Sequence, residues 1–222
     1  MQFEDKLSYQ KQECGVCHFS WYYPEFNGEV LTPIERLFYL QVSMCPHCKY
    51  CSENIQETVD NESELIQSKQ YLSIIKSRND KYGLVCHRES YILIAYAYLK
   101  EQLGENLLAG KAYLVGAELE EMQYKAYLES TLYKPEYDDE MIKESKKNIN
   151  KYLVLGLNNI IKYANQQEEL DLKVHLLLSY AYALNKNKES ALEHLSLALK
   201  MNPPAEYVDI MQIINQTIKE IA

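Results

Sequence analysis

The sequence predicts a mostly α-helical protein in which a small β-rich module, residues 1–58, precedes a helical-repeat domain, residues 59–222. Three observations predict this fold. Five of the six cysteines and the single tryptophan lie before residue 55, among segments with the two-residue alternation of strands. After residue 60, apolar residues recur at the three- and four-residue spacing of amphipathic helices. Two stretches of the helical part also match each other, which indicates repeated helix pairs.

The N-terminal module is expected to contain two strands joined through a turn. Residues 38–44 place large apolar groups at every second position, and residues 18–23 have a strand-like composition. Asn27-Gly28 lies between them and suits a hairpin turn, because both residues tolerate positive φ. Residues 32–35 resemble a helix start, with an N-cap threonine, an N1 proline and a capping-box glutamate. A short helical turn is therefore expected before the second strand.

Helices are expected through the rest of the chain. Breaks are expected at Gly83, Gly104, Pro135, residues 185–187 and Pro203-Pro204, since glycine, proline and asparagine interrupt helices. The expected helices span residues 62–78, 87–102, 105–130, 138–165, 169–185, 188–201 and 204–220.

Two C-x2-C pairs in the N-terminal module predict a metal site. Cys14 and Cys17 form one pair, and Cys45 and Cys48 form the other. Each such turn, here called a knuckle, presents two thiolates to one ion, and its backbone N–H groups can bond the sulfurs. Two knuckles together complete a tetrahedral S₄ site for structural Zn²⁺. Four protein sulfurs leave no open position for water, so metal-assisted hydrolysis is not expected.

Alternatives to this zinc site remain open at the level of sequence. Iron fits the same cage, and the cysteine pairs suit a redox switch, although no βαβ unit surrounds either pair as in thioredoxin-like motifs. Cys51 forms a further C-x2-C with Cys48, so it could replace Cys48 or Cys45 as a ligand. His18 and His47 adjoin knuckle cysteines and could bind metal or hydrogen-bond the sulfurs.

The internal match resembles the tetratricopeptide repeat. Residues 172–205 fit its pattern, except that His175 stands where an aromatic residue such as tryptophan is usual. Residues 88–121 form a looser copy with a turn two residues longer, and residues 119–165 fit poorly. The resemblance implies stacked antiparallel helix pairs. The matching residues in the C-terminal copy are Leu178, Ser179, Tyr182, Ala191, Leu195, Ala198 and Pro203.

The same resemblance implies a concave groove lined by the first helix of each pair, where a peptide segment would bind. It assigns Lys173, Leu176 and Tyr180 to this surface in the C-terminal copy and Tyr96 in the first copy. Apolar, tyrosyl and charged groups together suit a protein or peptide partner. Neighbouring helices that cover these residues are the competing interpretation.

Two knuckles followed by a tetratricopeptide-like region also resemble a family of bacterial proteins of unknown function. The second knuckle of that family reads roughly Cys-Pro-x-Cys-Gly-Tyr-Ala, and residues 45–51 read Cys-Pro-His-Cys-Lys-Tyr-Cys. Lys49 departs from the family's glycine and Cys51 from its small residue. The resemblance implies zinc binding and a helical partner domain, and it implies no reaction.

The charge of the chain bears on its partners and location. The net charge of −9 disfavours nucleic acid and anionic membranes, and residues 1–55 hold four basic against seven acidic side chains. The most apolar run, residues 91–99, is too short to span a bilayer, and the N-terminus does not resemble a secretion signal. A cytoplasmic location is expected.

The sequence therefore predicts a noncatalytic zinc-binding protein whose helical repeat domain mediates protein–protein interaction. A cysteine-based redox switch and a nucleic-acid-binding zinc ribbon remain as alternative functions. No catalytic constellation of side chains is evident.

Overall fold

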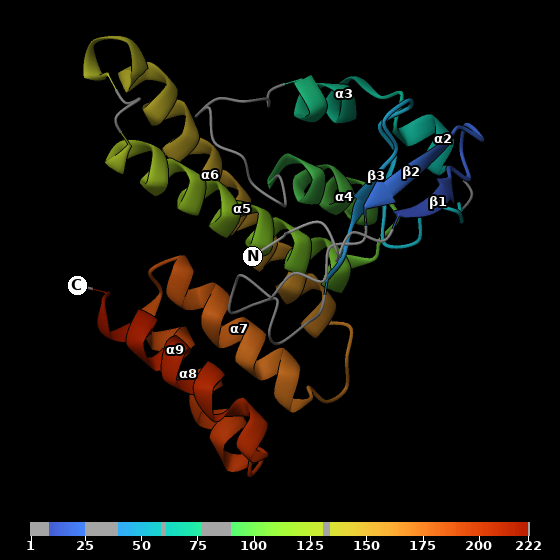
Figure 1. Cartoon of the computed structure of the whole chain (residues 1–222). Helices are drawn as coiled ribbons and strands as arrows, with labels where there is room; N and C mark the ends of the chain where they lie inside the picture. Colours follow the sequence, from blue (N-terminus) through green and yellow to red (C-terminus); the bar gives the residue numbers. More distant parts are fainter. Residues whose placement is uncertain (1–8, 25–39, 59–60, 77–89, 131–133, 222) are drawn as a thin grey trace, which may run out of the picture.

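The computed structural model describes residues 9–24, 40–58, 61–76, 90–130 and 134–221. Small β-hairpins lie at the N-terminal end of this described chain, and helices make up most of the remainder (Figure 1). The prediction of a mostly α-helical protein with a small β-rich module is confirmed. The predicted turn at residues 27–28, the helix start at residues 32–35 and the sixth cysteine, Cys86, lie outside the described residues.

The strands form two separate antiparallel hairpins. β1 (Tyr9–Glu13) pairs with β2 (Ser20–Pro24), so that Glu13 opposes Ser20, and β3 (Ser43–Met44) pairs with β4 (Cys51–Ser52). The expected hairpin between residues 18–23 and 38–44 is therefore wrong. Each strand instead pairs across its own knuckle, because only a few residues separate the two arms there. Of the described residues in the second expected strand, only Ser43–Met44 forms a paired strand.

The helices follow the predicted order with shifted ends. The expected helix at residues 62–78 is two short helices, because Ser68 accepts a hydrogen bond from the Tyr71 N–H and starts a new one. The predicted break at Pro135 separates a helix that ends at Glu129 from one that begins at Pro135, and the proline takes the first helical position. The helices are α2 (Glu62–Leu65), α3 (Lys69–Lys76), α4 (Ser90–Gln102), α5 (Asn106–Glu129), α6 (Pro135–Ala164), α7 (Leu172–Leu184), α8 (Lys188–Lys200) and α9 (Val208–Lys219), the last after the 3₁₀ turn η2 (Ala205–Tyr207).

Helices α5 and α6 lie antiparallel and cross closely (Figure 1). Gly110 and Gly156 meet at the crossing, where a Cβ atom on Gly110 would lie 2.6 Å from Ile160 Cγ1 and 3.0 Å from the Gly156 carbonyl oxygen. At the α4–α5 crossing, a Cβ atom on Gly116 would lie 2.5 Å from Ile94 Cδ1. Glycine is needed at Gly110, where facing backbone occupies the space of a side chain, whereas at Gly116 the nearest atom is the end of the Ile94 side chain, which can shift.

Helices α7 and α8 form an antiparallel pair at the C-terminal end, and α9 packs on α7. The Ser179 hydroxyl donates a 2.7 Å hydrogen bond to the Ala191 carbonyl oxygen, which explains the small residues at this crossing. Asn185 joins the pair to α6 by donating to the Leu153 carbonyl oxygen at 3.1 Å. The expected helix pair is present, and its status as one copy of a repeat stays a prediction.

One hydrophobic cluster extends from Cys14 in the first knuckle through Tyr71 and Leu114 to Ile218 in α9. The module and the helices thus share a core, and the predicted boundary at residue 58 stays a prediction. Within the described chain, no helix combines the length and apolar character needed to span a bilayer.

Candidate metal centre

The two knuckles repeat one backbone geometry. The His18 N–H donates to the Cys14 carbonyl oxygen at 2.8 Å, and the Lys49 N–H donates to the Cys45 carbonyl oxygen at 3.0 Å. His18 has a φ of 56° and Lys49 a φ of 67°, so both residues lie in the left-handed region. Glycine is favoured in this region because it has no Cβ atom. Lys49 thus adopts a conformation that glycine would accommodate more readily.

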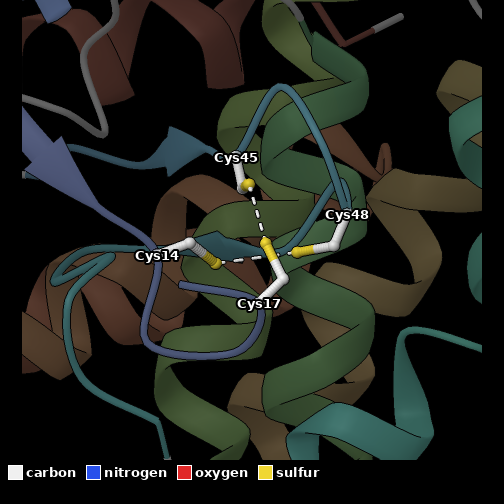
Figure 2. A group of neighbouring side chains, drawn as sticks. All are labelled: Cys14, Cys17, Cys45 and Cys48. Atoms are coloured by element: carbon white, nitrogen blue, oxygen red, sulfur yellow. Dashed lines mark hydrogen bonds between the residues drawn. The ribbon is translucent and has the colours of Figure 1, made fainter. Parts of the chain in front are cut away.

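The knuckles bring four sulfur atoms together (Figure 2). Cys14 Sγ lies 3.6 Å from Cys48 Sγ, and Cys17 Sγ lies 3.7 Å from Cys45 Sγ, so both close pairs join one knuckle to the other. All four sulfurs lie within 4.8 Å of one another. Both close distances are far longer than a disulfide bond of about 2.05 Å, so these cysteines are free thiols.

The sulfur positions fit a tetrahedral metal ion. With Zn–S distances of about 2.3 Å, a regular tetrahedron separates its sulfurs by about 3.8 Å. The two measured cross-knuckle distances lie close to this value. Thiolate sulfur is the ligand type of structural zinc and of iron in the same geometry. The residues present therefore fit a four-cysteine metal site, with each knuckle supplying two ligands.

Burial, backbone N–H groups and neighbouring side chains shift the pKa values of the thiols. Burial raises the pKa of Cys14, and burial together with the neighbouring sulfurs raises the pKa of Cys48. Burial also acts to raise the pKa of Cys17, but hydrogen bonds from the Phe19 N–H, His47 and the other sulfurs outweigh it and lower that pKa to about 6. The four thiols are adjacent, so they do not all ionise together unless a cation compensates their charge.

Cys51 lies outside this group of sulfurs. Its thiol is buried and donates to the Lys49 carbonyl oxygen at 3.4 Å, and burial raises its pKa to about 12. Among the described residues, the group that could hold a metal consists of the two knuckle pairs alone. His18 and His47 also lie outside it. His47 instead stacks on Phe19, with ring centroids 5.3 Å apart, and hydrogen-bonds the Cys17 sulfur.

Three buried tyrosines attach the second knuckle and the segment after it to the helices. Tyr71 on α3 donates to the Lys49 carbonyl oxygen at 2.5 Å. Tyr50 donates to Glu62 Oε2 at the start of α2, also at 2.5 Å. Tyr96 on α4 donates to Glu53 Oε2 at 2.8 Å. The hydroxyl groups thus connect the backbone around the metal ligands to three helices.

A buried carboxylate completes this attachment. Glu62 is 1% exposed, and Lys100 Nζ lies 3.7 Å from Glu62 Oε1 and 2.9 Å from Glu105 Oε1. A buried carboxylate needs such partners because an unpaired charge is strongly disfavoured in a protein interior. No local pattern in the sequence predicted that Tyr50 and Tyr96 would pair with Glu62 and Glu53, because the partners come from distant segments.

The first knuckle is attached by close backbone contact. The Gly15 N–H donates to the Ile55 carbonyl oxygen at 3.0 Å. A Cβ atom at Gly15 would lie 2.5 Å from the Gln56 carbonyl oxygen and 2.9 Å from Thr58 Cγ2. The chain that leaves the second knuckle therefore covers the first one, and only glycine fits between them.

The structure buries most of the residues predicted to bind a partner. Tyr96 and Leu176 are completely buried, and Tyr180 is buried with its hydroxyl donating to the Glu118 carboxylate. Lys173 is exposed. The three buried side chains pack between helices and do not line an open groove. This agrees with the competing interpretation, in which neighbouring helices cover these residues. In this conformation a partner can reach Lys173 but not the other three.

Compared with known proteins, the chain matches no protein-family model, no curated protein and no solved structure. The assignment of the site therefore rests on its geometry. The resemblance to the bacterial family stays a prediction, and the arrangement that supports it is a four-cysteine cluster followed by a helical domain.

Proposed function

We propose that this protein is a noncatalytic, zinc-stabilised scaffold whose helical domain binds a protein partner. The convergence of four knuckle sulfurs on one point carries this proposal. A zinc ion held by four cysteines has no open coordination position, so its contribution is to folding and not to a reaction. The ion would hold two short hairpins that bury little apolar surface by themselves.

The proposed role of zinc extends beyond the hairpins, since the second knuckle is attached to α3 through Tyr71 and the following segment to α4 through Tyr96. Zinc that fixes Cys45 and Cys48 would also fix the backbone to which these hydroxyls donate. The module is therefore proposed to cover the first helices of the domain only when metal is bound.

The test of the metal is elemental analysis combined with cobalt substitution. We expect about one zinc per chain and, after exchange for Co²⁺, the visible absorption of a tetrahedral thiolate site. Chelation should lower the melting temperature of the full chain. Purification with stoichiometric iron would identify iron as the natural ion. An absence of metal together with an unchanged melting temperature in chelator would contradict the structural role.

Exposed apolar side chains on α8 support the partner-binding part of the proposal. Leu192 and Leu199 are 46% and 52% exposed and lie seven residues apart, so they share one face of α8. Met201 at the end of the same helix is 46% exposed. Clustered exposed apolar residues often mark interaction surfaces in folded proteins.

Partner binding is tested by affinity capture with surface variants. The double variant Leu192→Ser, Leu199→Ser leaves the core intact and should abolish capture of any specific partner. Lys173→Ala tests the exposed residue predicted from the sequence. The matched control is Leu72→Ser, since Leu72 on α3 is 36% exposed and lies away from α8. A partner retained equally by all variants would show that the α8 face does not bind it.

The cysteine-based redox switch is a second candidate, because the sulfurs approach each other across the knuckles and not within them. Oxidation of Cys14 with Cys48 and of Cys17 with Cys45 would form two disulfides, release the metal and transfer four electrons to an oxidant such as a peroxide. Peptide mapping after limited peroxide treatment tests this function. Fully reversible cross-knuckle disulfides would support it, whereas slow, scrambled oxidation would favour the structural site.

A further inference from the structure

Two histidines connect the last helix pair, far along the chain from the metal centre. His175 Nδ1 on α7 lies 3.0 Å from His194 Nδ1 on α8, and the ring centroids are 5.3 Å apart. The centroid separation exceeds the nitrogen separation by roughly the centre-to-nitrogen distances of the two rings. The two nitrogens therefore point at each other. This is the geometry of an N–H···N hydrogen bond in which one Nδ1 carries the proton and the other accepts it.

The surroundings restrict how this pair accepts further protons. Both rings are partly buried, and the Tyr182 ring stacks on His194 at 5.6 Å with an interplanar angle of 10°. Burial lowers the pKa of both histidines, and His175 lowers the pKa of His194 further. Asp171 at the start of α7 and Glu193 on α8 act in the opposite direction. The acidic charges that shift the two pKa values thus come from the N-cap of α7 and from α8.

We propose that the His175–His194 pair, here called the histidine bridge, is a proton-sensitive contact that holds α8 on α7. A first added proton goes to the free Nε2 of the donor ring and leaves the bridge intact. A second proton must go to the accepting Nδ1. Two Nδ1–H groups then face each other, so the hydrogen bond is lost and two positive charges repel across the helix pair.

The sign of the pH effect follows from the lowered pKa values. The unfolded helices bind protons as the pH falls below about 6.5, the ordinary value for histidine, while the folded pair resists them. The stability of the α7–α8 pair is therefore full above this pH and decreases below it. The Ser179–Ala191 hydrogen bond also joins α7 to α8 and contains no titratable group. Acid should therefore loosen the two helices without separating them.

A metal ion between the two rings is the competing interpretation. Metal binding needs both nitrogen lone pairs to converge on a point beside the line that joins them. The measured distances show that both ring nitrogens instead point along the line that joins them. In the described chain, no third cysteine, histidine or carboxylate joins the pair to form a metal-binding group. The geometry thus favours a shared proton.

The proposal is tested by hydrogen exchange on the zinc-loaded full chain at about pH 7.5 and about pH 5.5, with zinc content measured at both. We expect protection of the α8 amides to fall about tenfold for each unit by which the histidine pKa values are lowered. Protection of α5 should change less. In His194→Gln the fall in α8 should be clearly smaller, because the repulsion between two protonated rings is lost and only the buried His175 still resists protonation. Lys200→Gln, at an exposed position at the end of α8, is the matched control and should behave as the unmodified protein.

A second measurement reads the bridge directly, by ¹⁵N NMR of the histidine side chains. One of the two bridging rings should carry its proton on Nδ1 at neutral pH. Equal pH dependence of α8 in the unmodified protein and His194→Gln would overturn the proposal. So would two rings protonated only on Nε2, or a second equivalent of Zn²⁺ that the zinc-loaded chain binds and His194→Gln does not.

Discussion

The hydroxyl of Tyr71 on α3 donates a 2.5 Å hydrogen bond to the main-chain carbonyl oxygen of Lys49, the residue that follows Cys48. Tyr71 is completely buried, and burial raises the pKa of its hydroxyl. The group therefore keeps its proton and remains a donor at any pH at which the protein is folded. This bond connects a helix directly to the backbone of a metal-binding turn.

Tyr71→Phe removes this donor and leaves the Lys49 carbonyl oxygen with only the weak thiol donor of Cys51 at 3.4 Å. We expect a loss of about 1–2 kcal/mol in the free energy of unfolding, the range for one partner of a buried hydrogen bond. Urea unfolding of the zinc-loaded protein measures it. Tyr22→Phe is the control, since Tyr22 is 71% exposed. Equal effects of the two substitutions would contradict the importance of the bond.

The ligand set predicts opposite results for two neighbouring cysteines. Cys48→Ser removes a sulfur from the group of four and should reduce bound zinc well below one equivalent. Cys51→Ser should keep one equivalent, because the Cys51 thiol bonds the Lys49 carbonyl oxygen, which a hydroxyl can also do. Elemental analysis of both purified variants measures the zinc that each one binds. Retention by Cys48→Ser with loss by Cys51→Ser would mean that Cys51 is the ligand.

The knuckles and the later helices were predictable from the sequence because their signals are local. A C-x2-C turn places two sulfurs by itself, and helix ends such as Asp171 and Asn187 are fixed by side chains that accept from N–H groups three residues later. The hairpin pairing was not predictable in this way. β3 and β4 contain two residues each, too few for a periodic pattern, and their pairing follows from the knuckle between them.

The predicted partner residues show a second limit. Tyr96 and Tyr180 have the amphipathic character of interface residues, yet both are buried with their hydroxyls bonded to Glu53 and Glu118. These carboxylates lie 43 and 62 residues away in the chain. A single sequence gives no sign of such long-range pairs, so a buried tyrosine with a satisfied hydroxyl looks the same as an exposed one.

Two glycines outside the helix crossings should respond differently to asparagine. Gly15→Asn places its Cβ atom about 2.5 Å from the Gln56 carbonyl oxygen, so the backbone must shift, and a loss of about 1–3 kcal/mol is expected. Gly104 has a φ of 78° with no atom within 4 Å of an added Cβ. Asparagine tolerates this conformation, so Gly104→Asn should be close to neutral. Thermal unfolding compares them, and a neutral Gly15→Asn would contradict the close contact between knuckle and chain.

The crossing of α5 and α6 predicts the sign of the stability change in Gly110→Ala. In an uncrowded helix, Gly110→Ala would stabilise the protein by up to about 1 kcal/mol, because alanine has the higher helix propensity. In this structure the new Cβ atom meets Ile160 Cγ1 at 2.6 Å and the Gly156 carbonyl oxygen at 3.0 Å.

Backbone on the facing helix cannot move away as a side-chain end can, so we expect Gly110→Ala to destabilise the protein by about 1–3 kcal/mol. Chemical unfolding measures the change. A stabilised variant would mean that α5 and α6 are farther apart than described. The stability losses of Gly110→Ala and Gly156→Ala should not be additive in the double variant, because both new methyl groups lie at one crossing and their effects are coupled.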